Sequence, residues 1–315
     1  MTFGFVFPGQ GSQSVGMLAA LAPAAGAESV IRDTFAEASA VLGYDLAQLV
    51  AQGPAERLNS TECTQPAMLA ASIATWRLWH ARGGADPTVV CGHSLGEFSA
   101  LVAAGALDFA PAVDLVRFRG RAMQEAVPAG TGAMAAILGL EDAQLIEACR
   151  EAAEGAIVEA VNFNAPGQVV IAGSRAAVER AIEVAKRLGA KRALALPVSV
   201  PAHSSLMRAA AARLGERLST IEVRPPRIRF VSAVDASLHE DPADLRQLLV
   251  RQLSSPVRWS ETVRALAASG LGALIECGPG KVLSALNRRI DRSLESLALE
   301  DAASLEAALT TTRAH

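Results

Sequence analysis

Short apolar runs alternate with stretches of helical periodicity along most of the chain. The runs at 3–7 and 88–91 have the length of buried strands, and each is followed by a glycine-rich turn and then by a helical pattern. Further strand-like runs lie at 228–234 and 272–276, between predicted helices and before a final helical region. Such alternation is typical of a mostly parallel sheet with helices on both faces, so the sequence predicts an α/β fold.

The middle of the chain has a different order of elements. It predicts strand, helix, strand, strand, helix, strand, at 132–140, 141–153, 156–162, 168–172, 174–188 and 191–196. This βαββαβ order is that of the ferredoxin-like unit. Proline-containing stretches bracket it, as linkers do. We therefore place a small ferredoxin-like domain at 128–197, inserted into a discontinuous large domain of residues 1–127 and 198–315.

Composition and charge exclude several classes of protein. The 315 residues are 51% hydrophobic and 19% charged, with a net charge of −3, which is a globular balance. There is no basic footprint for nucleic acid, and no segment reaches the ~18 uninterrupted apolar residues that a membrane span needs. The N-terminus has no basic region ahead of its apolar stretch. We expect a cytoplasmic protein without nucleic-acid or membrane partners.

The cysteines and histidines predict no metal site. The four cysteines are far apart and form no CxxC pair, and the five histidines include no HExxH spacing. We therefore expect buried thiols, no disulfide framework, no metal and no cofactor.

Gly92-His-Ser-Leu-Gly96 fits the GxSxG nucleophile elbow, and it lies between a predicted strand and a predicted helix, as that motif requires. Glycines on both sides permit a sharp turn that exposes the Ser94 hydroxyl, while the helix N-terminus directs free N–H groups at an oxyanion. The structural alternative is that Ser94 only caps the helix. Glu97, in the first turn of that helix, is expected to be an ordinary structural acid.

A serine nucleophile needs a base, and His203 is the best candidate for it. His80, His239 and His315 lie in polar or terminal surroundings, and the side chain of His93 should diverge from the nucleophile on an elbow. His203 lies where an apolar strand ends and a helix begins, which is where sheet enzymes build sites. A loop histidine without a role is the alternative.

Arg119 lies on the apolar face of the helix predicted at 112–126, because its i±3 and i±4 neighbours are Leu115, Val116, Ala122 and Met123. A buried guanidinium must find an anion. That anion is either an internal carboxylate, which the residues alone favour, or the carboxylate of a dicarboxylic acyl substrate.

Two glycine-rich loops fail nucleotide-binding templates. The loop at 8–12 would need glycine where Ser14 stands, and the loop at 278–281 would need glycine at Ile275 and a hydroxyl at Val282. A loop at a strand end can instead lend an N–H to an oxyanion hole.

Several ordered motifs together resemble the malonyl-CoA:acyl-carrier-protein transacylases, an acyltransferase family of fatty-acid and polyketide synthesis. They are Phe7-Pro-Gly-Gln-Gly-Ser-Gln13, Thr64-Gln65-Pro66, Gly92-His-Ser-Leu-Gly-Glu97, Arg119-Gly120, Asn162-Phe-Asn-Ala-Pro-Gly167, His203 and Gly278-Pro-Gly-Lys281. The resemblance runs from residue 3 to about residue 290.

This resemblance implies a large α/β-hydrolase-like domain with the inserted ferredoxin-like domain, and a ping-pong cycle through malonyl-Ser94. His203 would activate Ser94 and later the phosphopantetheine thiol, and Gln252 would orient His203 through its carbonyl group. Backbone N–H groups of Gln10 and Leu95 would form the oxyanion hole.

The same resemblance makes Arg119 the partner of the malonyl carboxylate, overturning the internal pairing favoured above, and places Gln65, His93 and Asn162 along the site. The partners would be malonyl-CoA or coenzyme A and the acyl carrier protein, and the enzyme would be a monomer. One departure is Ala202, since malonyl-selective relatives often carry an aromatic residue before the histidine, and a roomier acyl pocket is expected.

Three alternatives differ in what would support them. A serine hydrolase of the α/β-hydrolase class shares the elbow, but its acid should lie between serine and histidine in the chain, and no acid stands out there. A nucleotide-binding module would bind ATP or NAD without acyl transfer. An acyltransferase serving a polyketide or malonate decarboxylase system would differ in its carrier protein.

Overall fold

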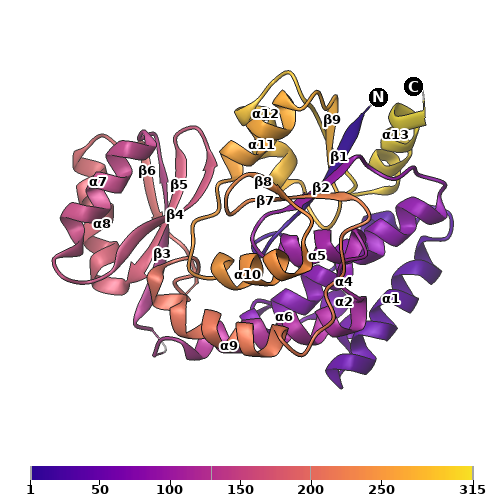
Figure 1. Ribbon diagram of the computed structural model, residues 1–315, viewed down its shortest axis with the longest axis horizontal. Helices are drawn as coiled ribbons and strands as arrows, with labels where there is room; N and C mark the ends of the chain where they lie inside the picture. Colours follow the sequence, from indigo (N-terminus) through magenta and orange to yellow (C-terminus); the bar gives the residue numbers. More distant parts are fainter. Residues whose placement is uncertain (1, 129, 199, 314–315) are drawn as a thin grey trace.

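The computed structural model describes residues 2–128, 130–198 and 200–313, which form two units joined side by side (Figure 1). The larger unit contains both ends of the described chain. The smaller unit lies at one end of the molecule and is built from consecutive residues in the middle of the sequence.

A six-stranded sheet forms the centre of the large unit. Its strands are ordered β10 (Glu295–Ala298), β9 (Ala273–Glu276), β1 (Phe3–Phe7), β2 (Val89–Gly92), β7 (Arg229–Ser232) and β8 (Ser237–His239). Neighbouring strands from β10 to β7 are parallel, and β8 alone is antiparallel. The prediction of a mostly parallel sheet in an α/β fold is confirmed.

Two parts of the predicted element order were wrong. The run predicted as one strand at 228–234 is β7, which is followed by a turn and the hairpin strand β8. The final helical region is interrupted by β10. Both missed strands have only three or four residues and are mostly not buried, so no apolar run marks them.

Helices cover both faces of this sheet because its central strand alternates. Phe3, Phe5 and Phe7 of β1 point into the larger core, whereas Val6 points into a second core. On the second face lie α11 (Trp259–Ala268) and α12 (Val282–Ile290). The remaining helices of this unit are α1 (Ala27–Leu42), α2 (Leu46–Gln52), α3 (Ala55–Leu58), α4 (Thr61–Ala81), α5 (Gly96–Ala103), α6 (Phe109–Glu125), α9 (Arg208–Leu218), α10 (Pro242–Gln252) and α13 (Ala302–Arg313), with short 3-10 turns at Ala19–Leu21 and Ser205–Met207.

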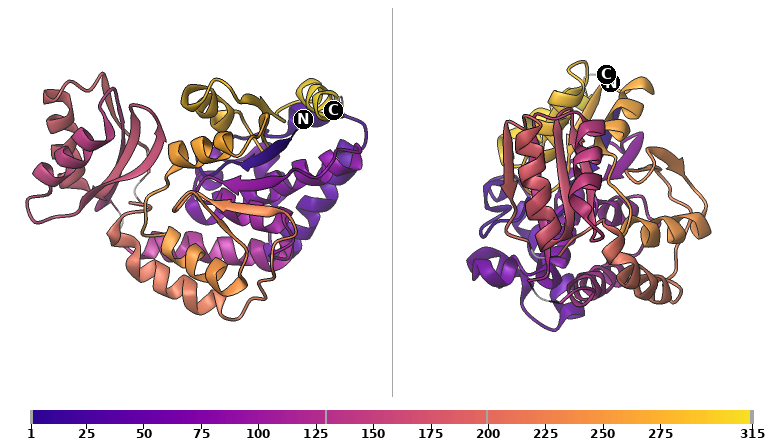
Figure 2. Two further views of the ribbon diagram at one scale, coloured as in Figure 1. Left: turned by 45° about the horizontal axis from the view of Figure 1, so that its top comes forward. Right: turned by 90° about the vertical axis from the view of Figure 1, so that its left-hand side faces the viewer.

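The small unit has the predicted βαββαβ order. Its elements are β3 (Gly132–Leu138), α7 (Asp142–Ala153), β4 (Val158–Ala165), β5 (Gln168–Ser174), α8 (Arg175–Arg187) and β6 (Arg192–Ala195). The strands form an antiparallel sheet in the order β4-β5-β3-β6, with α7 and α8 packed on one face (Figure 2). We propose 128–197 as the extent of this domain.

The exposed edge of β4 joins the small unit to the large one. The Phe163 N–H donates to the Val257 carbonyl at 2.9 Å, and the Val257 N–H donates to the Val161 carbonyl at 2.8 Å. Nearby, the Glu159 carboxylate accepts from both the N–H and the hydroxyl of Ser205, at 2.7 and 2.8 Å. The two units are therefore connected by backbone hydrogen bonds and by the contact between Glu159 of β4 and Ser205. Ser205 is two residues from His203 in the sequence.

None of the described helices is long and apolar enough to cross a membrane.

Candidate active site

Ser94 occupies a sharp turn between β2 and α5 and has a φ of 53°, in the left-handed region. The flanking glycines are required by close packing. A Cβ atom at Gly92 would lie 2.0 Å from the carbonyl carbon of Gly96, and one at Gly96 would lie 2.0 Å from the Phe7 carbonyl oxygen. A strained backbone at a non-glycine residue persists only where its surroundings fix it, and such strain is typical of functional turns. The geometry is that of a nucleophile elbow.

His203 lies against Ser94 although 109 residues separate them in sequence. Its Nε2 atom is 2.7 Å from Ser94 Oγ, and its Nδ1 atom is 2.9 Å from the Gln252 carbonyl oxygen, at the end of α10. A carbonyl group only accepts, so Nδ1 carries the proton and Nε2 accepts the serine O–H. The structure brings together Ser94, His203 and the Gln252 carbonyl group in the arrangement that a base and its nucleophile need.

Burial keeps this imidazole neutral. Desolvation lowers the pKa of His203 from 6.5 to about 3, and the positive charge of Arg119 contributes in the same direction. A neutral imidazole at physiological pH is available to take the serine proton.

The same pKa shift predicts that His203 does not titrate between pH 5 and 8. Long-range ¹H–¹⁵N NMR of the imidazole nitrogens should show one constant neutral tautomer through this range, protonated at Nδ1. The imidazole of His203 binds its proton near pH 6.5 in the unfolded chain and near pH 3 in the folded chain. His203 should therefore reduce the free energy of unfolding as the pH falls from 6.5 to 3. A midpoint near 6.5 for His203, identified by its loss in His203→Ala, would contradict the burial argument.

Arg119 extends from α6 into the same site and is only 1% exposed. Its Nη1 donates to Gln65 Oε1 at 2.9 Å, and its Nη2 donates to Gln252 Oε1 at 3.0 Å and to Ser94 Oγ at 3.4 Å. Its Nε has no hydrogen-bond partner in the part of the chain that the structure describes. Burial lowers the pKa of Arg119 to about 10, which leaves the guanidinium charged at neutral pH.

The ion pairs among the described residues include none with Arg119. The internal pairing that the residues alone favoured is therefore wrong for direct contact. A buried guanidinium held by two amide oxygens beside a serine hydroxyl can accept a carboxylate from outside the chain.

Glu97 differs from the ordinary structural acid that was expected. It is 1% exposed, and its carboxylate accepts from Ser232 Oγ, from the Ala233 N–H and from Gln252 Nε2. Burial raises the pKa of Glu97 to about 7. An apolar i+3 and i+4 neighbourhood, Ala100 and Leu101, was the available sequence signal that this acid faces inward.

The two expected oxyanion donors lie on adjacent loops. The loop after β1 packs on the elbow so closely that a Cβ atom at Gly9 would lie 2.5 Å from the His93 carbonyl oxygen. Among the hydrogen bonds of the described chain, the backbone N–H groups of Gln10 and Leu95 have no acceptor. We propose both groups as oxyanion donors; the Gln10 side chain is exposed and the Leu95 side chain is buried.

The three residues expected to line the site have different surroundings. Gln65 is buried and contacts Arg119 directly. His93 contacts Asn164, with Nε2 2.8 Å from Oδ1, and packs on the Trp259 ring rather than joining Ser94. The Asn162 Oδ1 atom is buried and has no hydrogen-bond partner among the described residues, so we propose that this amide faces a ligand.

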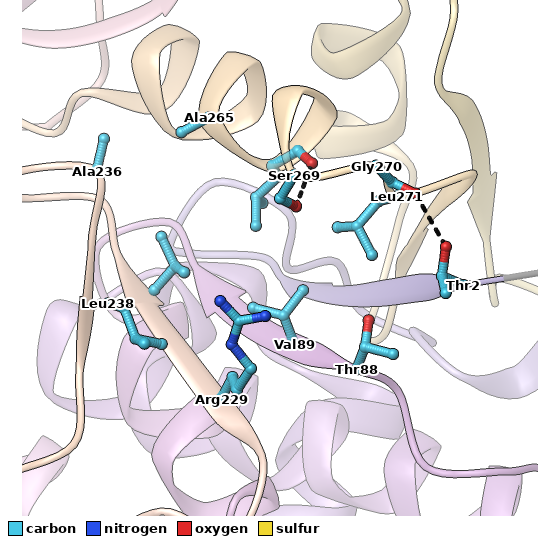
Figure 3. Close-up of a pocket in the computed structure, with 12 residues that line it drawn as sticks. Thr2, Thr88, Val89, Arg229, Ala236, Leu238, Ala265, Ser269, Gly270 and Leu271 are labelled. Carbon is cyan, nitrogen blue, oxygen red and sulfur yellow. Dashed lines mark hydrogen bonds between the residues drawn. The ribbon is translucent and has the colours of Figure 1, made fainter.

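Two cavities differ in their relation to this chemistry. One of about 310 Å³ lies at the amino ends of the parallel strands, where Thr2, Thr88 and Arg229 line it (Figure 3). Ser94 follows the carboxyl end of β2, so this cavity is not part of the site. The other, of about 660 Å³, lies between the two units and has His203 among its lining residues.

Comparison with known proteins first defines the class. The model of the acyl transferase domain matches residues 4–309, which is nearly the whole chain. The fold and this match to the family over residues 4–309 show that the chain is an acyl transferase.

The relatives are more specific. A malonyl CoA-acyl carrier protein transacylase of Salmonella typhimurium is 56% identical over 308 residues, which are 98% of this chain and 99% of that protein. The crystal structure of an acyl carrier protein S-malonyltransferase from Vibrio cholerae has a TM-score of 0.94 and 56% identity, covering 98% and 100% of the two chains. A malonyl-transacylase in complex with its type II PKS acyl-carrier protein has a TM-score of 0.96 and 54% identity, covering 99% and 100%. This chain belongs to the malonyl CoA-acyl carrier protein transacylase family.

Proposed function

We propose that this enzyme transfers a malonyl group from malonyl-CoA to the phosphopantetheine thiol of an acyl carrier protein, supplying extender units for fatty-acid synthesis. The observation that carries the proposal is Arg119, a buried cation 3.4 Å from the hydroxyl of the candidate nucleophile and without a carboxylate partner among the described residues. A malonyl group supplies a carboxylate to such a cation, whereas an acetyl group does not. The names of the relatives agree with this substrate.

The first half of the cycle acylates Ser94. His203 Nε2 takes the hydroxyl proton while Oγ forms a bond to the thioester carbon. The oxyanion that develops accepts hydrogen bonds from the N–H groups of Gln10 and Leu95. The C–S bond then breaks, His203 gives its proton to the sulfur, and coenzyme A leaves as the free thiol.

The second half reverses these steps with a different thiol. His203 takes the proton of the phosphopantetheine thiol, whose sulfur attacks the malonyl-Ser94 ester. The same N–H groups hold the oxyanion, the C–O bond breaks, and Ser94 recovers its proton from His203. The Gln252 carbonyl group keeps the imidazole in the required tautomer throughout.

Arg119 holds the malonyl carboxylate during both halves, and Gln65, His93 and Asn162 line the path of the substrate. We propose that the enzyme acts as a cytoplasmic monomer without a metal or cofactor. The carrier protein is the second substrate, and a structurally similar malonyl-transacylase has been solved in complex with its acyl-carrier protein.

Two alternatives have different relations to these observations. A polyketide carrier protein as acceptor is favoured by the same neighbour, whose carrier belongs to a type II PKS. A serine hydrolase is disfavoured, because the group at Nδ1 of His203 is a backbone carbonyl rather than the carboxylate of a Ser-His-Asp triad.

Intact-protein mass spectrometry tests the proposal. After mixing with malonyl-CoA, the enzyme should gain the mass of one malonyl group, and adding the phosphopantetheine-loaded acyl carrier protein should move that mass to the carrier. Presenting fatty-acid and polyketide carriers in parallel identifies the acceptor. Loss of the adduct to water at the same rate with and without carrier would instead indicate a hydrolase.

A further inference from the structure

We propose that Glu97 is a specificity-determining positioning residue, which fixes the orientation of the Gln252 side-chain amide and thereby holds Arg119 ready for the acyl carboxylate. The inference rests on the proposed function. Glu97 itself does not touch the reacting atoms.

The Glu97 carboxylate faces three hydrogen-bond donors, so it acts as an acceptor in each of these contacts. Oε1 accepts from Ser232 Oγ and from the Ala233 N–H, each at 2.7 Å, and Oε2 accepts from Gln252 Nε2. Ser232 Oγ also accepts from the Val234 N–H at 3.1 Å, so its own proton points to Glu97. Every neighbour in this network donates to the carboxylate, which is the set of contacts that an ionised Glu97, present above its pKa of about 7, requires.

The Glu97 carboxylate acts together with the Ser94 carbonyl oxygen and Arg119 to fix which way the Gln252 amide points. Nε2 donates both to Glu97 and to the Ser94 carbonyl oxygen, the latter at 2.9 Å, so Oε1 is turned to Arg119 Nη2. In the flipped amide, Oε1 would face two acceptors without a proton, and Nε2 would face a guanidinium that can only donate. Both contacts would be lost, so the flipped form is unfavourable.

The arrangement also balances charge without occupying the arginine. The negative charge of Glu97 raises the pKa of Arg119, opposing the effect of burial. The amide of Gln252 lies between the two charges, so the carboxylate does not pair directly with the guanidinium. Arg119 therefore stays charged while its substrate-facing side remains available.

Glu97→Gln preserves the size of the side chain but breaks this logic. Glutamine has one carbonyl oxygen, and it cannot face Gln252 while also accepting from the Ala233 N–H. If its amide nitrogen faces Gln252, two donors oppose each other unless Gln252 flips away from Arg119. If its oxygen faces Gln252, its nitrogen opposes the Ala233 N–H.

The test is the ratio of Ser94 acylation rates with malonyl-CoA and acetyl-CoA, measured by rapid mixing, chemical quenching and intact-protein mass spectrometry. We expect Glu97→Gln to reduce the malonyl preference by roughly 10- to 100-fold, as loss of a hydrogen bond to a charged group does, with a smaller change in the acetyl rate. Glu276→Gln is the matched control. Glu276 is equally buried and accepts from the N–H groups of Leu283 and Ser284, so it stabilises a helix start outside the site. It should leave the ratio unchanged.

A double-mutant cycle asks whether Glu97 acts through Gln252. Gln252→Met removes the amide but keeps the backbone carbonyl, and it should reduce the ratio to a similar extent. Adding Glu97→Gln to it should then change the ratio by less than about threefold. The inference is overturned if Glu97→Gln keeps the wild-type ratio or if the two effects multiply.

Two further outcomes are informative. If Glu97→Gln does not fold, Gln252→Met alone reads the same step, and an unchanged ratio in that variant refutes the inference. If wild type shows no malonyl preference, the proposed function fails, and the inference fails with it.

Discussion

Ser94→Ala should remove the acyl-enzyme completely and reduce malonyl transfer to the carrier protein by about 10⁴-fold or more, as loss of a catalytic serine does in enzymes with covalent intermediates. No other hydroxyl is held 2.7 Å from His203 Nε2 among the described residues. The ping-pong route then has no acceptor for the first half-reaction. Intact mass after malonyl-CoA and the rate of malonyl-carrier formation measure the two effects.

Ser99→Ala is the matched control for this experiment. Ser99 lies in α5, five positions beyond Ser94, and its buried hydroxyl has no hydrogen-bond partner within residues 2–128, 130–198 and 200–313. Its adduct and transfer rate should equal those of wild type. A malonyl adduct that persists in Ser94→Ala would show that the nucleophile is another residue.

Arg119→Ala should remove the preference for malonyl-CoA over acetyl-CoA, which we expect to be about 10⁴-fold in wild type. In wild type, an acetyl group leaves the buried guanidinium without an anion, whereas malonyl supplies one. In the variant, neither acyl group meets a buried cation, so the two rates should become similar. Acylation rates with both thioesters give the ratio directly.

Arg117→Ala provides the comparison within the same helix. Arg117 contacts Asp114 and the Leu42 carbonyl oxygen, at 2.6 and 3.1 Å, and lies outside the site. It should retain the wild-type preference. If Arg119→Ala also retained it, Arg119 would be a structural residue and the acyl carboxylate would bind elsewhere.

Elements with strong local signals could be predicted from the sequence. The parallel strands β1, β2 and β9 are apolar runs bounded by turns. In the small unit, the order of strands and helices could be predicted because each element has the hydrophobic periodicity of its own type. Short strands with few buried residues, such as β8 and β10, have no such pattern, because their pairing depends on a neighbouring strand rather than on their own residues.

The site divides in the same way. Ser94 lies in a local motif whose turn needs two glycines, and the inward position of Arg119 follows from helical spacing. Residue chemistry alone could not identify Gln252, since its carbonyl group meets His203 only through the placement of α10, and this residue entered through family resemblance. The hydrogen bonds of Glu97 could not be predicted, because its donors at 232, 233 and 252 are more than a hundred residues away in sequence.

The seam between the two units limits how this enzyme can be recombined with its relatives. A small domain exchanged at its termini alone would bring a new β4, whose edge must pair with Val257 and whose acid at position 159 must meet Ser205. Segments 200–207 and 252–258 must therefore come from the same parent protein as β4. We expect a chimera that takes β4 from one relative and these two segments from another to keep the fold of both domains but to lose turnover. The reason is that the loop of His203 would no longer match the β4 residues it contacts.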